Sequence, residues 1–217
     1  NRSSPVAVDL GAGMTAVSVS AGYVHSCAVL NDGSLKCWGD NGNGQLGDGT
    51  TTDRTSPTAV DLGAGMTAVS VSGGSYHACA VLNDGSVKCW GYSTSGQVGD
   101  GSTTTRLTPT AVDLGVDMTA MSVSAGYVHS CAVLNDGSVK CWGDNDYGQL
   151  GDGSTTDRLT PTAVDLGAGM TAVSVSSGDL HSCAVLNDGS VKCWGRNDYG
   201  QVGDGSTTDR SSPVAVD

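Results

Sequence analysis

Cysteine is the residue of this sequence best suited to covalent or metal chemistry, and its eight copies recur in regular pairs. The two members of a pair are ten positions apart, and successive pairs are offset by 52 residues. The pairs are Cys27 with Cys37, Cys79 with Cys89, Cys131 with Cys141, and Cys183 with Cys193. Two thiols at a fixed spacing can form a disulfide or can supply two ligands to a metal ion.

A turn motif, LNDGS, separates the two cysteines of each pair. If Gly33 takes a positive φ as the bulge after a type I turn, Leu30 pairs with Ser34 and Cys27 falls opposite Cys37. Cross-strand Cβ atoms are then about 4.5–5.5 Å apart, close to disulfide distance. The register therefore predicts four disulfides, each within one copy. Four disulfides are typical of an oxidising compartment, so we expect a secreted, extracellular or cell-surface protein.

A metal site is the alternative interpretation of the same residues. His25 and Cys27 lie on one face of a strand by their spacing, and Cys37 would lie beside them. A structural zinc ion needs four ligands, but no fourth ligand recurs and every copy can pair its own cysteines. We therefore expect no metal and no cofactor at these positions.

One histidine recurs in every copy: His25, His77, His129 and His181. A ring of imidazoles can bind a metal or a ligand. The alternative is a buried histidine whose ring nitrogens tie adjacent backbone segments together, and repetition in every copy favours this structural role.

The acidic residues do not predict a catalytic site. The run Asp40, Asn41, Asn43 and Gly44 resembles a calcium loop, which needs several oxygen ligands at alternating positions. The second copy has Tyr92 and no acids in this run, so we expect no shared calcium site, although a single copy could bind weakly.

No Ser, His and Asp set stands apart from the repeat, and the sequence has no Glu. We therefore expect no enzyme activity.

Composition limits the partners and the fold. The formal net charge is -12, with ten Lys and Arg among 217 residues, which argues against nucleic-acid binding. No run of about 18 apolar residues exists, so we expect no membrane insertion. No cleavable signal is visible at the start, so a secreted protein would be represented here by its mature form or an excerpt. The 33 glycines and the absence of Phe and Ile favour short strands and tight turns.

The 52-residue period divides the chain into copies 10–61, 62–113, 114–165 and 166–217, with 1–9 duplicating the end of a copy. One copy contains four candidate strands. They span residues 57–62, 67–72, 77–82 and 86–91. Four short strands are typical of one propeller blade. The Gly- and Thr-rich segment 44–57 is interpreted as a long connection that links blades.

These motifs resemble the repeat of the regulator of chromosome condensation family, in a secreted, cysteine-containing form. The residues that carry the resemblance in the first copy are Gly22, His25, Asp32, Gly33, Trp38, Gly39, Asn41, Gly44, Gln45, Leu46 and Gly47. The second copy departs mildly, with Ser93 and Val98 at two of these places. The resemblance covers all four copies. It implies an all-β propeller, or an open propeller-like array, of four four-stranded blades within a larger array or assembly, since family members typically have seven blades. Trp38 and its equivalents are then expected to pack between blades.

The copies differ from one another mainly in two runs. The register brings Val24 beside Asp40 at the open end of each hairpin, so both runs share one face and the invariant LNDGS turns lie at the other end. The predicted binding residues on this variable face are Tyr23, Val24, Asp40, Asn43, Ser75, Tyr76, Tyr92, Thr94, Tyr127, Val128, Asp144, Tyr147, Asp179, Leu180, Arg196 and Tyr199. Tyr and Asn are common in adaptable binding surfaces. The alternative is that these loops simply tolerate drift.

These features are consistent with two functions. The first is an extracellular, non-catalytic scaffold that engages a protein or glycan through the variable face. The second is a structural component that assembles with further copies of itself into a fibre or surface layer. Segments 1–9 and 209–217 are nearly identical and occupy the same phase, so both would compete for one strand position in a closed ring. We therefore predict that the chain does not close into an isolated four-bladed ring.

Overall fold

Residues 4–217, the part of the chain that the computed structural model describes, form sixteen β-strands in four antiparallel sheets. The first sheet contains β1 (Ala16–Ala21), β2 (His25–Leu30), β3 (Leu35–Gly39) and β4 (Arg54–Val60). The second contains β5 (Ala68–Gly73), β6 (His77–Leu82), β7 (Val87–Gly91) and β8 (Arg106–Val112). The third contains β9 (Ala120–Ala125), β10 (His129–Leu134), β11 (Val139–Gly143) and β12 (Arg158–Ala163). The fourth contains β13 (Ala172–Ser177), β14 (His181–Leu186), β15 (Val191–Gly195) and β16 (Arg210–Ala215).

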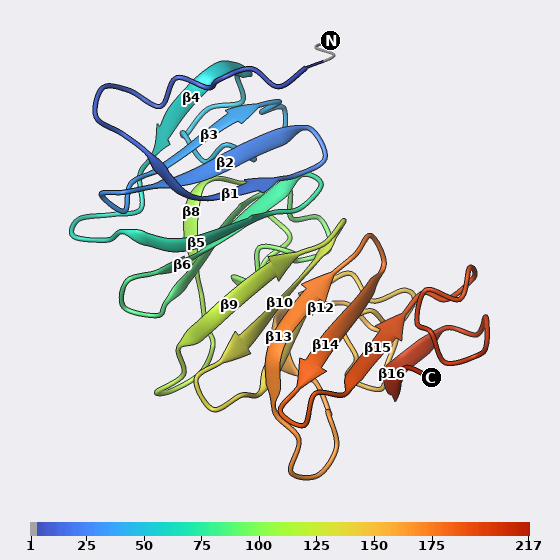
Figure 1. Ribbon diagram of the computed structural model, residues 1–217. Coiled ribbons are helices and arrows are strands. Elements are labelled where there is room, and N and C mark those ends of the chain that lie inside the picture. The colour runs from blue at the N-terminus through green and yellow to red at the C-terminus, as the bar shows by residue number, and fades with distance from the viewer. Residues whose placement is uncertain (1–3) are drawn as a thin grey trace.

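The four sheets are the blades of an open propeller (Figure 1). Each blade is a meander in sequence order, and the innermost strands β1, β5, β9 and β13 pack against one another in turn. The first and fourth blades stand apart at the two ends of the arc, so the chain does not form a closed ring, as predicted (Figure 1). Among residues 4–217, none forms a helix that is long and apolar enough to cross a membrane.

The two chain ends, predicted to be equivalent, differ in structure. Residues 1–3 of the first segment lie outside the described residues, and residues 4–9 form no strand. In the second segment, residues 210–215 form β16, the outer strand of the fourth blade. The apolar Val6 of the first segment is therefore left 56% exposed.

One prediction about connections was wrong. The Gly- and Thr-rich segment after β3 does not link blades, because it leads into β4 of the same sheet. The fourth strand starts at Arg54 rather than at residue 57, and Arg54 pairs with Gly39. The short segment 61–67 makes the link to the next blade. The long loop was misassigned because its turn-rich composition does not reveal which strands it joins.

The hydrophobic cores lie between neighbouring blades. Leu46 and Cys37 of the first blade are buried in one cluster with Ala80 and Trp90 of the second. The Trp90 indole Nε1 donates a hydrogen bond to the Gln45 carbonyl at 2.9 Å. Trp142 and Trp194 repeat this bond in the next two interfaces, which confirms tryptophan as the inter-blade residue.

Gly47 permits the close packing of this tryptophan. Its φ is +70°, and a Cβ at this position would lie 2.8 Å from Nε1 of Trp90. The same clash would occur at Gly99 against Trp142 and at Gly151 against Trp194. The GQLG or GQVG motif of each of the first three copies therefore forms part of the surface on which the next blade sits.

The two ends of the array expose faces that are buried elsewhere. Trp38 of the first blade is only partly buried, whereas Trp90 is fully buried. In the fourth blade Val185 is 39% exposed, whereas the equivalent Val81 is 2% exposed and Val133 is 1% exposed. The interior of the array is therefore continuous, and each end lacks one neighbouring blade.

The four predicted disulfides are present. Cys27 and Cys37 are directly opposed, with their Cα atoms 4.1 Å apart, and the other three pairs match them. The turn has the predicted form, since Leu30 N donates to the Ser34 carbonyl at 2.8 Å and Gly33 has a φ of +79°.

Candidate binding face

The variable runs meet at one end of each central hairpin. His25 pairs with Gly39, and the Asp40 amide donates to the Val24 carbonyl at 3.0 Å. The LNDGS turn lies at the opposite end of the same hairpin and packs on the next blade, where a Cβ at Gly33 would lie 2.5 Å from Thr67 Cβ. The predicted separation into a variable and an invariant end is therefore correct.

A pocket of about 390 Å³ opens on the variable face. It is centred on the second and third blades, which contribute most of its lining residues. The lining contains Asn43, Tyr76, Tyr92, Thr94, Ser95, Tyr127, Val128, Asp144, Asp146, Tyr147 and Leu180. Nine of these belong to the predicted set, and Ser95 and Asp146 are the two additions. We call this the tyrosine pocket.

Four tyrosines form a connected aromatic group, and three of them, Tyr76, Tyr92 and Tyr127, line this pocket. The ring of Tyr76 makes edge-to-face contacts with Tyr23 and Tyr127, each with centroids 6.0 Å apart, and with Tyr92 at 6.4 Å. Such contacts fix ring orientation as well as burying area. Partial burial raises the pKa of Tyr76, and the neighbouring Tyr127, Tyr23 and Asp40 raise it further.

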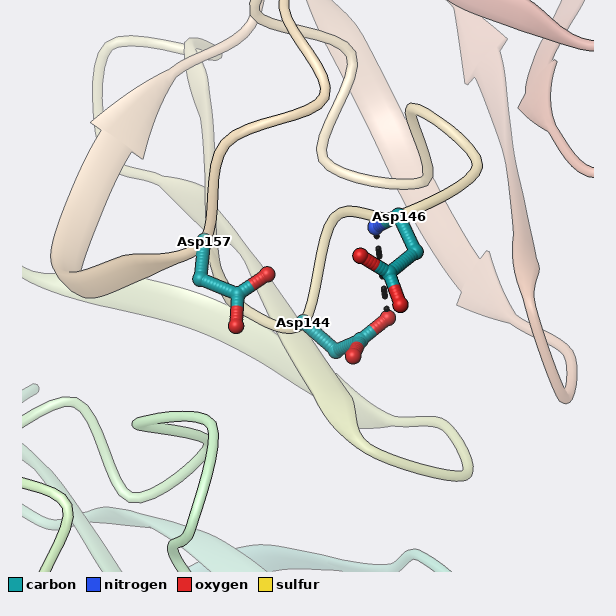
Figure 2. Close-up of side chains that lie close together, drawn as sticks. All are labelled: Asp144, Asp146 and Asp157. Atoms are coloured by element: carbon teal, nitrogen blue, oxygen red, sulfur yellow. Dashed lines mark hydrogen bonds between the residues drawn. The ribbon is translucent and has the colours of Figure 1, made fainter.

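One rim of the tyrosine pocket is acidic, because Asp144 and Asp146 line it. Carboxylate oxygens of Asp144, Asp146 and Asp157 lie within 4.8 Å of one another (Figure 2). The Asp144 carboxylate accepts hydrogen bonds from the Gln149 side chain and, at 3.4 Å, from the Asp146 amide. Burial raises the pKa of Asp144, and the charges of Asp157 and Asp146 add to the increase. The rim therefore concentrates negative charge beside the aromatic rings.

A second, smaller opening of about 220 Å³ lies where the inner turns of the four blades converge. It contains the predicted residues Tyr23, Ser75 and Asp179. Backbone hydrogen bonds of 3.2 Å connect the turns, for example from Tyr23 N to the Gly74 carbonyl. Because its walls are largely glycine and backbone, this opening offers fewer side chains to a ligand than the tyrosine pocket.

Four predicted residues line neither opening: Val24, Asp40, Arg196 and Tyr199. Arg196 forms an ion pair with Asp198 at 2.6 Å, and its guanidinium carbon lies 5.2 Å from the centre of the Tyr147 ring. Tyr199 is 87% exposed. The variable residues of the fourth blade therefore extend the face beyond the pocket.

Two of the four recurring histidines contact the next blade, and they do so through a serine side chain rather than through the backbone segments predicted. His77 Nε2 lies 2.9 Å from the Ser130 hydroxyl of the next blade, and His129 repeats the contact with Ser182. The Ser130 hydroxyl donates to the Gln97 carbonyl, so Nε2 of His77 is the donor in this pair. Burial lowers the pKa of both His77 and His129 to about 3.

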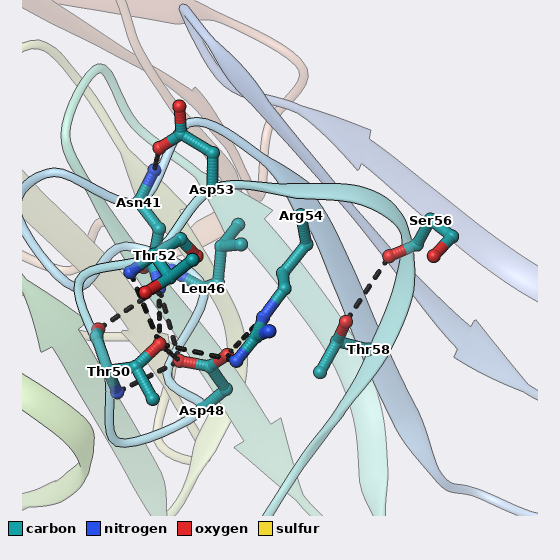
Figure 3. Close-up of polar contacts among 9 residues, drawn as sticks. All are labelled: Asn41, Leu46, Asp48, Thr50, Thr52, Asp53, Arg54, Ser56 and Thr58. Carbon is teal, nitrogen blue, oxygen red and sulfur yellow. Dashed lines mark hydrogen bonds and ion pairs between the residues drawn. The ribbon is translucent and has the colours of Figure 1, made fainter.

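A polar network within the long loop was not anticipated from the sequence (Figure 3). The buried Asn41 side-chain amide donates to Asp48 Oδ1 at 3.1 Å and to the Thr50 and Thr52 carbonyls, and its oxygen accepts from Leu46 N. Asp48 also forms an ion pair with Arg54 at 2.7 Å. In the first copy, the side chains of Asn41 and Asp48 are thus engaged by partners within the loop itself.

A signal for this network was present in the repeats. Asn41 N donates to Asp53, and in the second copy the equivalents of these two residues change together, to Ser93 and Thr105. The Asp48 and Arg54 pair recurs in all four copies with N–O distances of 2.5–2.7 Å. Paired changes between copies indicate spatial contact, just as they do between homologues.

Four-stranded meanders, an inter-blade tryptophan and a GQLG support loop define the class of protein: a β-propeller of the regulator of chromosome condensation type. The chain belongs to the RCC1-like domain family, whose model matches residues 1–217.

Known relatives agree with this assignment. The chain is 33% identical over 213 residues to the ultraviolet-B receptor UVR8 of Arabidopsis thaliana, an alignment that covers 98% of this chain and 48% of the receptor. The crystal structure of human WBSCR16 matches with a TM-score of 0.85 and 25% identity, covering 94% of this chain and 54% of that protein. Yeast RCC1 shares the fold, with a TM-score of 0.65 and 17% identity over 94% of this chain and 62% of its own. The chain thus spans about half the length of UVR8 and WBSCR16.

Proposed function

We propose that this chain is a non-catalytic binding scaffold of the extracellular space or cell surface, and that its variable face engages a protein or glycan. RCC1-like propellers are typically used for protein interaction, which supports a protein partner in general terms. The four disulfides support an oxidising location, because such bonds are rare in reducing compartments.

The observation that carries this proposal is the coincidence of sequence variation with a pocket. Nine of the sixteen residues chosen because they vary between copies line the tyrosine pocket. Simple drift of loop residues would not be expected to gather tyrosines from different blades around one opening. Tyrosine provides large, rigid contact area together with a hydroxyl, and it is enriched in binding surfaces.

The experiment compares the two ends of one blade. One variant replaces Tyr127 and Tyr147 with alanine, and its matched control replaces Asn135 and Ser138 in the invariant turn. Both variants and the unaltered chain are applied to a glycan array and are screened against a library of extracellular proteins. Each partner that is found is then confirmed with purified components. We expect the tyrosine variant alone to lose the partner. Equal losses, or a loss confined to the control, would refute the proposal.

Self-assembly is the second candidate, and the exposed ends of the array favour it. Between inner blades, a valine such as Val81 on one blade is buried in the same cluster as the tryptophan of the next blade. The equivalent valine of the fourth blade, Val185, is exposed, and Trp38 of the first blade is only partly buried. These two end faces therefore match each other as neighbouring blades do. A second copy placed head to tail would repeat the inter-blade contact and could propagate. Light scattering after size exclusion tests this, because Val185→Asp should abolish concentration-dependent growth in mass. Unchanged mass over a wide concentration range in the unaltered chain would reject it.

A further inference from the structure

The tyrosine pocket combines aromatic rings with carboxylates. Tyr76, Tyr92, Tyr127 and Tyr147 contribute rings from two adjacent blades, and Asp144 contributes a half-buried carboxylate at the rim. Aromatic faces attract cations through the negative potential of the ring, and the attraction grows as the cation is desolvated. A cation in this pocket would therefore be attracted both by the faces of the tyrosine rings and by the aspartate carboxylate.

The charges around the pocket are unbalanced. Among the described residues, its lining includes Asp144 and Asp146 and no lysine or arginine. Asp157 lies beside these two acids. The nearby Arg196 is already neutralised by its ion pair with Asp198 at 2.6 Å. The protein as a whole carries a formal charge of -12, so its field also draws positively charged partners towards this face.

The same chemistry is already present once within the molecule. The Arg196 guanidinium lies over the Tyr147 ring, 5.2 Å from its centre, while its nitrogen atoms contact the Asp198 carboxylate. One guanidinium can thus stack on a tyrosine ring and form an ion pair with an aspartate at the same time on this surface. Its planar shape suits both stacking on a ring and paired hydrogen bonds to a carboxylate, which an ammonium group cannot match.

We propose that the tyrosine pocket receives an arginine side chain of a partner protein, stacked between tyrosine rings and paired with Asp144. This proposal rests on the proposed function, because it specifies what the variable face recognises. The pocket volume of about 390 Å³ lies within the range of small-ligand sites, so the side chain and part of its backbone would fit.

Short blocked peptides test this proposal on the intact chain. The probes are acetyl-Gly-Arg-Gly-amide, the same peptide with citrulline, which keeps the shape and removes the charge, and the same peptide with lysine. Perturbation of the tyrosine ring signals by NMR gives the affinity. We expect the arginine peptide to bind at least about tenfold more tightly than the citrulline peptide, as a charge interaction of this kind provides, and more tightly than the lysine peptide.

Matched variants locate the site. Asp144→Asn removes the charge but keeps the oxygen that accepts from Gln149, so the fold should be retained. Its control is Asp136→Asn, which removes the same charge from the invariant turn of the same blade. Tyr127→Ala removes a pocket ring, and Tyr199→Ala is the control because Tyr199 lies outside the pocket. We expect Asp144→Asn and Tyr127→Ala to weaken arginine binding by about tenfold and both controls to leave it unchanged.

Equal binding of the arginine and citrulline peptides, tighter binding of the lysine peptide, or equal effects of Asp144→Asn and Asp136→Asn would overturn the proposal. A neutral oligosaccharide bound in the pocket without any response to the arginine peptide would also overturn it. This last result would leave the proposed function standing, since the variable face would still bind a ligand. Conversely, a partner that binds regardless of Tyr127 and Tyr147 would refute the proposed function even if the arginine peptide occupied the pocket.

Discussion

His77 Nε2 and the Ser130 hydroxyl lie 2.9 Å apart and join the second blade to the third. The serine in turn donates to the Gln97 carbonyl at 3.0 Å, so three polar groups are connected inside a buried interface. The interface between the first and second blades lacks this connection. There, alanine occupies the serine position as Ala78, and His25 is buried with no hydrogen-bond partner for either ring nitrogen among residues 4–217.

Replacing this alanine should therefore stabilise the protein. Ala78→Ser supplies the missing hydroxyl to His25, and we expect a gain of about 0.5–1.5 kcal/mol in the free energy of unfolding. Urea denaturation measures it. The control is Ala80→Ser, which adds a hydroxyl on the same strand and should destabilise. A loss of stability in both variants would show that the contact does not hold the blades together.

The reciprocal change removes an existing contact. Ser130→Ala leaves the His77 ring buried without its partner, and we expect a loss of about 1–3 kcal/mol in the free energy of unfolding. The same urea titration measures it, and Ser122→Ala is the control because the Ser122 hydroxyl makes no hydrogen bond in the described part of the chain. An equal, small effect of the two substitutions would contradict this role of Ser130.

Mild acid should destabilise the protein through the buried histidines. Burial lowers the pKa of His77 and His129 from 6.5 to about 3, so between these values the unfolded chain binds protons that the folded chain does not. Their contribution to stability is complete above pH 6.5 and is lost as the pH falls towards 3. Each should cost about 2 kcal/mol between pH 7.5 and pH 5. Urea midpoints at the two pH values should differ less in His77→Gln than in the unaltered chain, and an equal difference would contradict this assignment.

Each disulfide should stabilise one blade. Replacing Cys79 and Cys89 together with alanine should lower the free energy of unfolding by about 2–3 kcal/mol, as expected for so short a loop. Replacing the pair Cys183 and Cys193 is the comparison, because Cys183 faces the exposed end of the array and its loss creates less of a buried cavity. Non-reducing peptide mapping of the unaltered chain should recover only bridges within copies. Bridges between copies, or free thiols, would contradict the predicted register.

The repeat and the turn register could be read from the sequence because both rest on local rules. The LNDGS turn determines which residues oppose one another, so the disulfides and the meeting of Val24 with Asp40 were predicted correctly. The destination of the long loop could not be predicted, because the pairing of Gly39 with Arg54 spans fifteen positions and depends on a network inside the loop. The tyrosine pocket could not be predicted either, since its lining comes from different copies that only the fold places side by side.

Hydrogen exchange, measured with and without the confirmed partner, shows whether the variable face carries the binding site. We expect the partner to slow amide exchange in the variable segments around Tyr76, Tyr92, Tyr127 and Tyr147, which line one pocket. The LNDGS turns, including Asn135 to Ser138, should exchange at the same rate in both states. Protection centred on those turns, with the tyrosine segments unchanged, would show that the partner binds at the invariant end of the blades and not at the variable face.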